Sequence, residues 1–169
     1  MSSCPPAQPT GPSATSASLA HLRMADVMVR NPICATPGMT VRQLATIFAE
    51  RKISGAPVVG PDGRLVGVVS RTDLFRRVTA DAKGSASSFL FDLLNDNVPP
   101  EQQPMPESLL TIGDFMAEQV ITATEDEPVG IVARRIAQAH VHRVVVIDRE
   151  RKPIGVATAL DFLKMFPIG

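Results

Sequence analysis

The sequence contains one pattern twice, and the two copies lie 88 residues apart. Residues 67–73 are Gly-Val-Val-Ser-Arg-Thr-Asp, and residues 155–161 are Gly-Val-Ala-Thr-Ala-Leu-Asp. Each copy is a short apolar run, then a hydroxyl residue (Ser70 or Thr158), then a carboxylate three positions later (Asp73 or Asp161). This pattern is typical of a strand that ends where a helix begins, with the hydroxyl residue as the helix N-cap.

The repeat extends well beyond this motif, because the same offset relates residues 26–75 to the second copy without a slip in register. The matches fall on strand cores and on one face of an amphipathic helix. That face consists of Val41, Leu44, Ala45, Phe48 and Ala49 in the first copy and of Val129, Val132, Ala133, Ile136 and Ala137 in the second. The chain is therefore predicted to be a duplicated β-α-β-β-α unit, an α+β fold that mixes helices and strands.

The elements expected in the first copy are a helical turn from Arg23, a strand at 33–35, a helix from Thr40 to about residue 52, strands at 56–59 and 65–69 joined by a turn, and a closing helix after Ser70. A capping box is predicted between Thr40 and Gln43. The two later strands should form a hairpin. The closing helix is expected to turn Leu74, Phe75 and Val78 inward.

One unit of about 55 residues is marginal alone, because its sheet and helices cannot bury both faces. We therefore expect the two copies to pack sheet to sheet about a pseudo-twofold axis. The predicted organisation is a disordered tail at 1–20, a first repeat at 21–79, a linker at 80–110 and a second repeat at 111–169. A short apolar helix is expected at 89–94, either as a packing strap or as a contact for a partner.

Composition excludes several classes of function. The core must be aliphatic, because the chain has seven Phe and neither Tyr nor Trp. Lys plus Arg equals Asp plus Glu at 17 each, which argues against a broad basic face for nucleic acid. Cys4 and Cys34 are too few for a disulfide framework or a zinc site. No apolar run approaches a membrane span, and residues 1–20 do not resemble a signal peptide, so the cytoplasm is the expected location.

The repeated motif offers chemistry that an anionic ligand would use. The start of a helix presents free N–H groups and the positive end of its dipole, which favour a phosphate. Asp73 or Asp161 could accept hydrogen bonds from sugar hydroxyls. The same residues also form an ordinary capping box that only stabilises a helix, and the sequence leaves both interpretations open.

Metal and enzyme functions are not favoured. His140 and His142 share a strand face but lack a third metal ligand nearby, so no metal site is predicted. The glycines are single residues, without the spacing of a phosphate-binding loop, and no catalytic constellation is present.

Taken together, the two copies resemble a tandem cystathionine-β-synthase (CBS) domain pair, also called a Bateman module. The resemblance rests on residues 24–41, 53–59 and 67–73 of the first copy and on 112–129, 141–147 and 155–161 of the second. It implies a regulatory module, not an enzyme and without a catalytic cofactor, that binds an adenosyl nucleotide between the repeats. It further implies a homodimer that passes the change to an effector protein.

The same resemblance implies which residues hold the nucleotide. It assigns the ribose hydroxyls to Asp73 and Asp161. It assigns the phosphate to Ser70 and Thr158, with Arg71, Arg143 and Lys52 as basic candidates. The residues expected to contact the adenine are Ile33, Ala35, Ile53 and Ser54 in the first copy and Ile121, Ala123, Val141 and His142 in the second.

The copies also differ. Pro57 of the first corresponds to Val145 of the second, and Arg71 and Thr72 correspond to Ala159 and Leu160. We therefore expect unequal sites, with phosphates held beside Ser70 and Asp73. A structural or dimerisation module of the same fold, without a ligand, is the alternative prediction.

Overall fold

The computed structural model describes residues 21–81 and 111–165. The tail, most of the linker with its expected helix at 89–94, and residues 166–169 lie outside the described residues. The first copy contains α2 (Met24–Val27), β1 (Val29–Arg30), α3 (Val41–Glu50), β2 (Gly55–Val59), β3 (Leu65–Ser70) and α4 (Arg71–Asp81). The second contains the 3-10 helix η2 (Ile112–Asp114), β4 (Thr122–Ala123), α6 (Val129–Gln138), β5 (Arg143–Ile147), β6 (Pro153–Thr158) and α7 (Ala159–Leu163).

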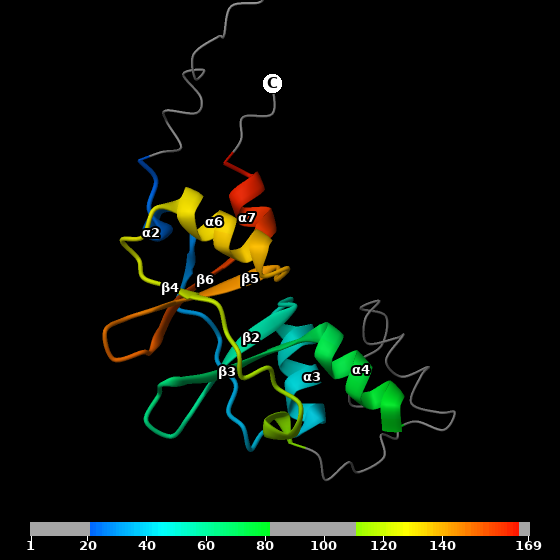
Figure 1. The fold of residues 1–169 in the computed structure, drawn as a ribbon. Coiled ribbons are helices and arrows are strands. Elements are labelled where there is room, and N and C mark those ends of the chain that lie inside the picture. The colour runs from blue at the N-terminus through cyan, green and yellow to red at the C-terminus, as the bar shows by residue number, and fades with distance from the viewer. Residues whose placement is uncertain (1–20, 82–110, 166–169) are drawn as a thin grey trace, which may run out of the picture.

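The predicted fold class is confirmed. The β2–β3 and β5–β6 hairpins lie at the centre of the molecule, with α6 and α7 on one side and α3 and α4 on the other (Figure 1). The hairpins have the same register, because Val58 pairs with Gly67 and Val146 pairs with Gly155. The sheets mix parallel and antiparallel pairs, since β4 runs parallel to β5 and β6 runs antiparallel to it.

The long helix of each copy forms as its spacing predicts. In α3 the Thr40 hydroxyl accepts from the Gln43 N–H at 3.3 Å, while the Gln43 side chain accepts from the Thr40 N–H at 2.9 Å. Most of each inward face is buried, Ala49 and Ala133 are half-buried, and Ala137 in α6 is exposed. Ala137 lies about 80° around the helix from Val129, at the margin of the apolar stripe, so placing it inside was wrong.

The closing helix of the first copy also departs from expectation. Leu74 is buried, but Phe75 is 38% exposed, so the expectation that it turns inward was wrong. Successive helical residues are rotated by about 100°, and a helix that points Leu74 at the core carries Phe75 away from it. The side chain of Val78 lies outside what the structure describes.

The strand expected at residues 33–35 is reduced to one bridge between Ala35 and Val58. In the second copy the Val145 N–H donates to the Ile121 carbonyl at 3.1 Å, and β4 forms beside it. The first copy has Pro57 at the equivalent position, and proline has no N–H to donate. Predicting a strand there was wrong because this proline removes its first ladder bond.

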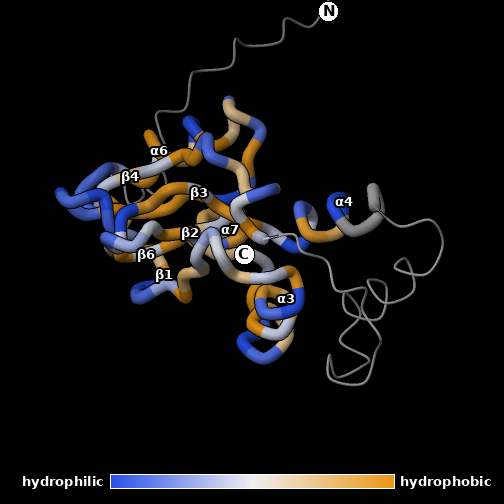
Figure 2. The backbone as a smooth tube through the Cα atoms, turned by 90° about the horizontal axis from the view of Figure 1, so that it is seen from below, coloured by the Kyte–Doolittle hydropathy of each residue, from blue (hydrophilic) through white to orange (hydrophobic). Residues whose placement is uncertain are grey.

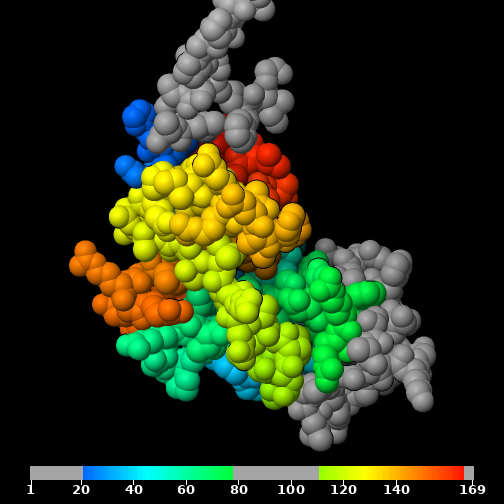
Figure 3. Space-filling model, viewed as in Figure 1, coloured from blue at the N-terminus to red at the C-terminus, as the bar shows by residue number. Residues whose placement is uncertain are grey.

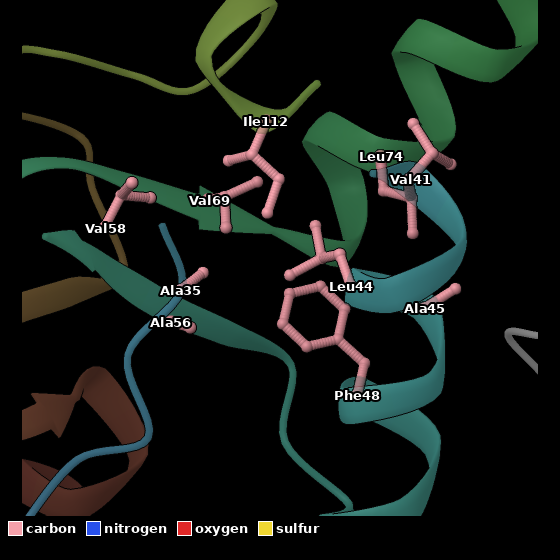
Figure 4. Packing of buried hydrophobic residues seen from close by; sticks show 10 residues of the cluster. All are labelled: Ala35, Val41, Leu44, Ala45, Phe48, Ala56, Val58, Val69, Leu74 and Ile112. Atoms are coloured by element: carbon pink, nitrogen blue, oxygen red, sulfur yellow. The ribbon is translucent and has the colours of Figure 1, made fainter. Parts of the chain in front are cut away.

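The leading segments of the two copies are exchanged. Strand β1 pairs with β6 of the second copy, and Ala117 bridges Val68 of the first. Met24 is fully buried in the core of the second repeat, whereas Ile112 points into the core of the first beside Val69 and Leu44 (Figure 4). In the space-filling view the yellow-green start of the second copy lies against the green first repeat (Figure 3). Each hydrophobic core therefore contains residues from both copies.

Two glycines make this exchange possible. A Cβ at Gly67 would lie 2.8 Å from the Met116 sulfur, and a Cβ at Gly155 would overlap the Met28 side chain. Each methionine comes from the other copy, so each glycine leaves room for the exchanged segment.

The sheets face one another through the residues that alternate with the core residues. Ala56 and Val58 belong to the first core and Val144 and Val146 to the second. Pro57 and Val145 are also buried, and the alternation of a strand turns them to the opposite face, toward the other repeat. Apolar strand residues accordingly fill the centre of the molecule (Figure 2). The expected sheet-to-sheet packing is present.

Candidate functional site

The start of α4 holds the first of the two repeated carboxylates. Asp73 Oδ2 accepts hydrogen bonds from the Ser70 N–H at 2.9 Å and from the Ser70 hydroxyl at 2.6 Å. The capping box is therefore formed. Asp73 Oδ1 accepts no hydrogen bond from any residue that the structure describes. The stabilising role thus uses one carboxylate oxygen and leaves the other available to a ligand.

The start of α7 holds the second carboxylate in a different environment. Asp161 Oδ2 accepts from the Thr158 N–H and hydroxyl at 2.9 and 2.7 Å, and Oδ1 accepts from the Lys164 ammonium at 3.0 Å. Partial burial raises the pKa of Asp161, but the hydrogen bonds from Thr158 and Lys164 outweigh it and leave that pKa below its ordinary value. Both oxygens of this carboxylate are engaged.

The capping box is not by itself evidence of a ligand. Thr111 and Asp114 form the same box at η2, with the Thr111 N–H and hydroxyl donating to Asp114 at 2.7 and 2.9 Å. At α2 the Arg23 N–H donates to Asp26 at 2.8 Å. Asp73 therefore differs from Asp26 and Asp114 through the groups near its second carboxylate oxygen, not through its capping box.

Arg143 supplies that distinction. It begins β5 in the second repeat, yet its guanidinium reaches the first repeat, where Nη2 donates to the Ser54 hydroxyl at 2.9 Å. It lies over Gly55, whose missing side chain makes the room, because a Cβ there would overlap Nη1 of Arg143. Burial lowers the pKa of Arg143, and the negative charge of Asp73 acts in the opposite direction. The structure thus brings Ser54, Asp73 and Arg143 together from both repeats.

The corresponding place beside Asp161 has no such arginine. The position equivalent to Arg143 is Gly55, which carries no side chain. The backbone is otherwise alike, because the Ser54 carbonyl accepts from the Arg71 N–H and the His142 carbonyl accepts from the Ala159 N–H, both at 3.0 Å.

Other predicted site residues are placed as follows. Arg71 donates to the carbonyl oxygens of Phe48 and Ile53, at 3.1 and 3.2 Å, and so closes the end of α3. Lys52 is exposed, with a left-handed φ of 52° just past that helix. Ala35 and Ala123 are buried at the strand bridges, Ile53 and Ile121 are half-buried, and Ile33, Val141 and His142 are exposed.

Two hollows formed by described residues lie outside this arrangement or beside it. One of about 640 Å³ is lined by residues 124–126, 147–150 and 154, and contains none of the predicted site residues. A smaller, open one of about 250 Å³ is lined by Asp73, Arg76, Arg77 and Phe115. Within the described residues, no three His, Cys, Asp or Glu side chains gather as metal ligands. None of the helices in residues 21–81 and 111–165 combines the length and hydropathy of a membrane span.

The sequence model of the CBS domain matches the chain twice, at residues 24–80 and 112–167. The chain belongs to the CBS domain family. The predicted resemblance is therefore confirmed, and the two matches correspond to the two copies of the repeat.

The sequence identity to individual relatives is low, at 26% for each of the following three. L-aspartate semialdehyde sulfurtransferase of Methanocaldococcus jannaschii is 26% identical over 83% of this chain, and the gamma-3 subunit of the human 5'-AMP-activated protein kinase is 26% identical over 70%. The chain spans 22% of the first relative's length and 21% of the second's. The CBS domain pair of protein MJ0100, solved with 5'-methylthioadenosine and S-adenosyl-L-methionine, is 26% identical with a TM-score of 0.66 and covers 86% of this chain and 95% of its own.

Proposed function

We propose that this CBS domain pair is a regulatory module that binds an adenosyl nucleotide, AMP, ADP, ATP or S-adenosylmethionine, between its two repeats. One arrangement carries the proposal: Asp73 Oδ1 accepts no hydrogen bond within the described residues, and the Arg143 guanidinium of the other repeat donates to Ser54 nearby, where its charge interacts with that of Asp73. A carboxylate can hold ribose hydroxyls, and a guanidinium can hold phosphate. The adenosyl ligands bound by the CBS pair of protein MJ0100 support the same ligand class.

The backbone carbonyl of Ile33 supports the proposal that adenine binds in the cleft beside Asp73, which we call the first cleft. Pro57 cannot donate to it, and no described residue does so in its place. Its counterpart in the second copy, the Ile121 carbonyl, is occupied by the Val145 N–H. A free carbonyl beside an exposed Ile33 side chain suits an adenine amino group, which is a donor on an apolar ring.

Because both repeats would form the proposed cleft, a bound ligand could be signalled to another protein through the angle between them. A bound ligand that prefers one angle between the repeats shifts the population toward that angle. An effector protein would then respond to the change. Exposed apolar side chains on α6 and α7, namely Ile131, Leu160 and Leu163 at 56%, 67% and 60% exposure, support the homodimer. We propose no catalytic role and a cytoplasmic location.

Titration calorimetry with AMP, ADP, ATP and S-adenosylmethionine tests the function. Saturable binding to the wild-type protein is expected, and the Asp73→Ala, Asp161→Ala double variant should lose it. Asp26→Ala is the matched control, because it removes a capping carboxylate at α2 without touching either proposed cleft. Equal loss of affinity in the control would mean that the carboxylates act only through stability.

The alternative is a ligand-free interaction module of the same fold. The saturated hydrogen bonding of Asp161 and the exposed apolar side chains of α6 and α7 favour it. Absence of binding for all four ligands, with a dimer retained in analytical ultracentrifugation, would support this function instead.

A further inference from the structure

The outer helices of the two repeats occupy equivalent places in the duplicated fold but differ in surface chemistry. Helices α6 and α7 pack against each other on one side of the molecule (Figure 1). They expose more than half of three large apolar side chains, namely Ile131, Leu160 and Leu163. The equivalent residues of α3 and α4 are Gln43, Thr72 and Phe75. Because both repeats fold, the exposed apolar set is not needed to build a repeat.

We call Ile131, Leu160 and Leu163 the second-repeat patch. It exposes roughly 300 Å² of apolar surface, about the size of the largest patch on a typical monomer. The exposed charges within residues 129–138 and 159–164 are Arg134 and Lys164, and Lys164 is paired with Asp161 at 3.0 Å. This face is therefore apolar and close to neutral, as the centre of a protein interface is.

Gly130 indicates a close contact on the same side of α6. It is the second residue of that helix and is exposed, and a Cβ there would meet no atom of the described chain within 4 Å. Glycine destabilises a helix relative to alanine, so a helical glycine usually has a packing reason. The described residues of the protomer supply none. The missing side chain leaves room for a neighbour from outside the protomer.

The partner that this chemistry fits is the same face of a second copy. In a two-fold contact each residue of one protomer meets its counterpart region on the other, so a patch must be self-complementary. Apolar side chains protrude beside the space at Gly130, and the near neutrality of the face lets two copies meet without covering an unpaired carboxylate.

The other possible arrangement of a homodimer opposes the second-repeat patch to the first repeat of the other copy. The exposed residues of α3 and α4 include Arg42, Glu50 and Arg76. That arrangement would place apolar side chains over these charged groups, and removing a charge from water without pairing it costs free energy. Contact between two second repeats avoids this cost.

We propose that the second-repeat patch is a self-interface, in which α6 and α7 of one copy pack against α6 and α7 of another. This inference rests on the proposed homodimer and names its arrangement. Because Thr158 and Asp161 begin α7, the same short helix carries a proposed ribose carboxylate and the interface residues Leu160 and Leu163.

Sedimentation velocity of the full chain over a range of concentrations measures the dissociation constant of the dimer. Leu163→Lys introduces a charge into the patch and should weaken the dimer at least about tenfold. Phe75→Lys makes the same charge change at the equivalent position of the first repeat and should change the constant less than about threefold. Gly130→Leu fills the proposed contact and should also weaken the dimer at least about tenfold, while the midpoint of urea unfolding does not fall.

Cross-linking tests the arrangement independently, in a Cys4→Ser, Cys34→Ser background. A bis-maleimide should link Leu163→Cys protein to itself. In a mixture of Leu163→Cys and Phe75→Cys proteins, preferential linkage of position 163 to position 75 would show that first and second repeats meet, and would overturn the proposal.

Equal weakening by Leu163→Lys and Phe75→Lys would overturn the arrangement, as would an unchanged dissociation constant in both Leu163→Lys and Gly130→Leu. A wild-type protein that is monomeric at every concentration would overturn the homodimer as well. Calorimetry with the four adenosyl ligands on the same samples measures nucleotide binding separately, so failure of the arrangement is distinguished from failure of the ligand-binding function.

Discussion

At the scale of single residues, the two copies differ most where one has glycine and the other arginine. Gly55 and Arg143 are one such pair, Gly63 and Arg151 are a second, and Arg42 and Gly130 are a third. The first pair decides which of the two proposed clefts receives an arginine from the other repeat. The second pair occupies the hairpin turns, where the backbone is left-handed in both copies, with φ of 76° at Gly63 and 64° at Arg151. A glycine adopts this conformation without strain, and an arginine does not.

We therefore expect Arg151→Gly to stabilise the protein. The relief of left-handed strain, about 1–2 kcal/mol, exceeds the entropy that glycine adds to the unfolded chain, so a net gain of about 0.5 kcal/mol is expected. Gly63→Ala should lose about 1 kcal/mol, because it introduces the same strain into the other hairpin. Urea unfolding followed by circular dichroism measures both. A loss of stability in Arg151→Gly would show that contacts of the arginine outweigh its strain.

At the scale of elements, Pro57 makes the first repeat an incomplete copy of the second. Val145 donates to Ile121 and begins the pairing of β4, while Pro57 leaves the Ile33 carbonyl without that donor. The difference is a single N–H group, yet it removes a strand and opens a carbonyl beside the candidate cleft.

Pro57→Val should complete the strand. The new N–H would reach the Ile33 carbonyl as Val145 reaches Ile121, and we expect about 0.5–1.5 kcal/mol from the hydrogen bond, less the entropy that proline saved in the unfolded chain. Hydrogen exchange should show a protected amide at position 57, and AMP affinity should fall because the carbonyl is occupied. Rapid exchange at that amide would show that the strand does not extend. Val145→Ala, which keeps the N–H, is the control.

At the scale of the whole molecule, the exchanged segments make the two repeats one folding unit. Met24 and Met28 complete the second core, and Ile112 completes the first. Neither repeat buries its core with its own residues alone. Under the proposed function, a ligand between the repeats would contact a single folding unit, because each repeat is tied to the other through its core.

Met24→Ala and Ile112→Ala should each destabilise the entire protein. Both side chains are fully buried, and such truncations cost about 2–5 kcal/mol. Unfolding in urea should remain a single transition in both variants, because each removed side chain supports the other repeat. Val66→Ala, at a position that is 38% exposed, should cost far less. Two separate transitions in either core variant would show that the repeats unfold independently.

Much of the fold could be predicted from the sequence because it depends on local rules. The helix face of α3, the capping boxes and the hairpins follow from spacing over a few residues, and the duplication extends them to the second copy. The acidic residues at the helix starts were found in the same way. Their identity as candidate ligands came from the family resemblance, not from the boxes, since Asp26 and Asp114 form similar ones.

The tertiary structure decided what depends on which surfaces meet. Two β-α-β-β-α copies, their resemblance to one family and the differences between them follow from the sequence alone. It could not show that β1 pairs with β6, that Met24 belongs to the second core, or that Arg143 reaches Ser54 of the first repeat. These facts follow from packing across the pseudo-twofold axis, between residues about 70 to 130 positions apart. At such separations no local periodicity links the partners, because the contact forms only when both copies have folded together.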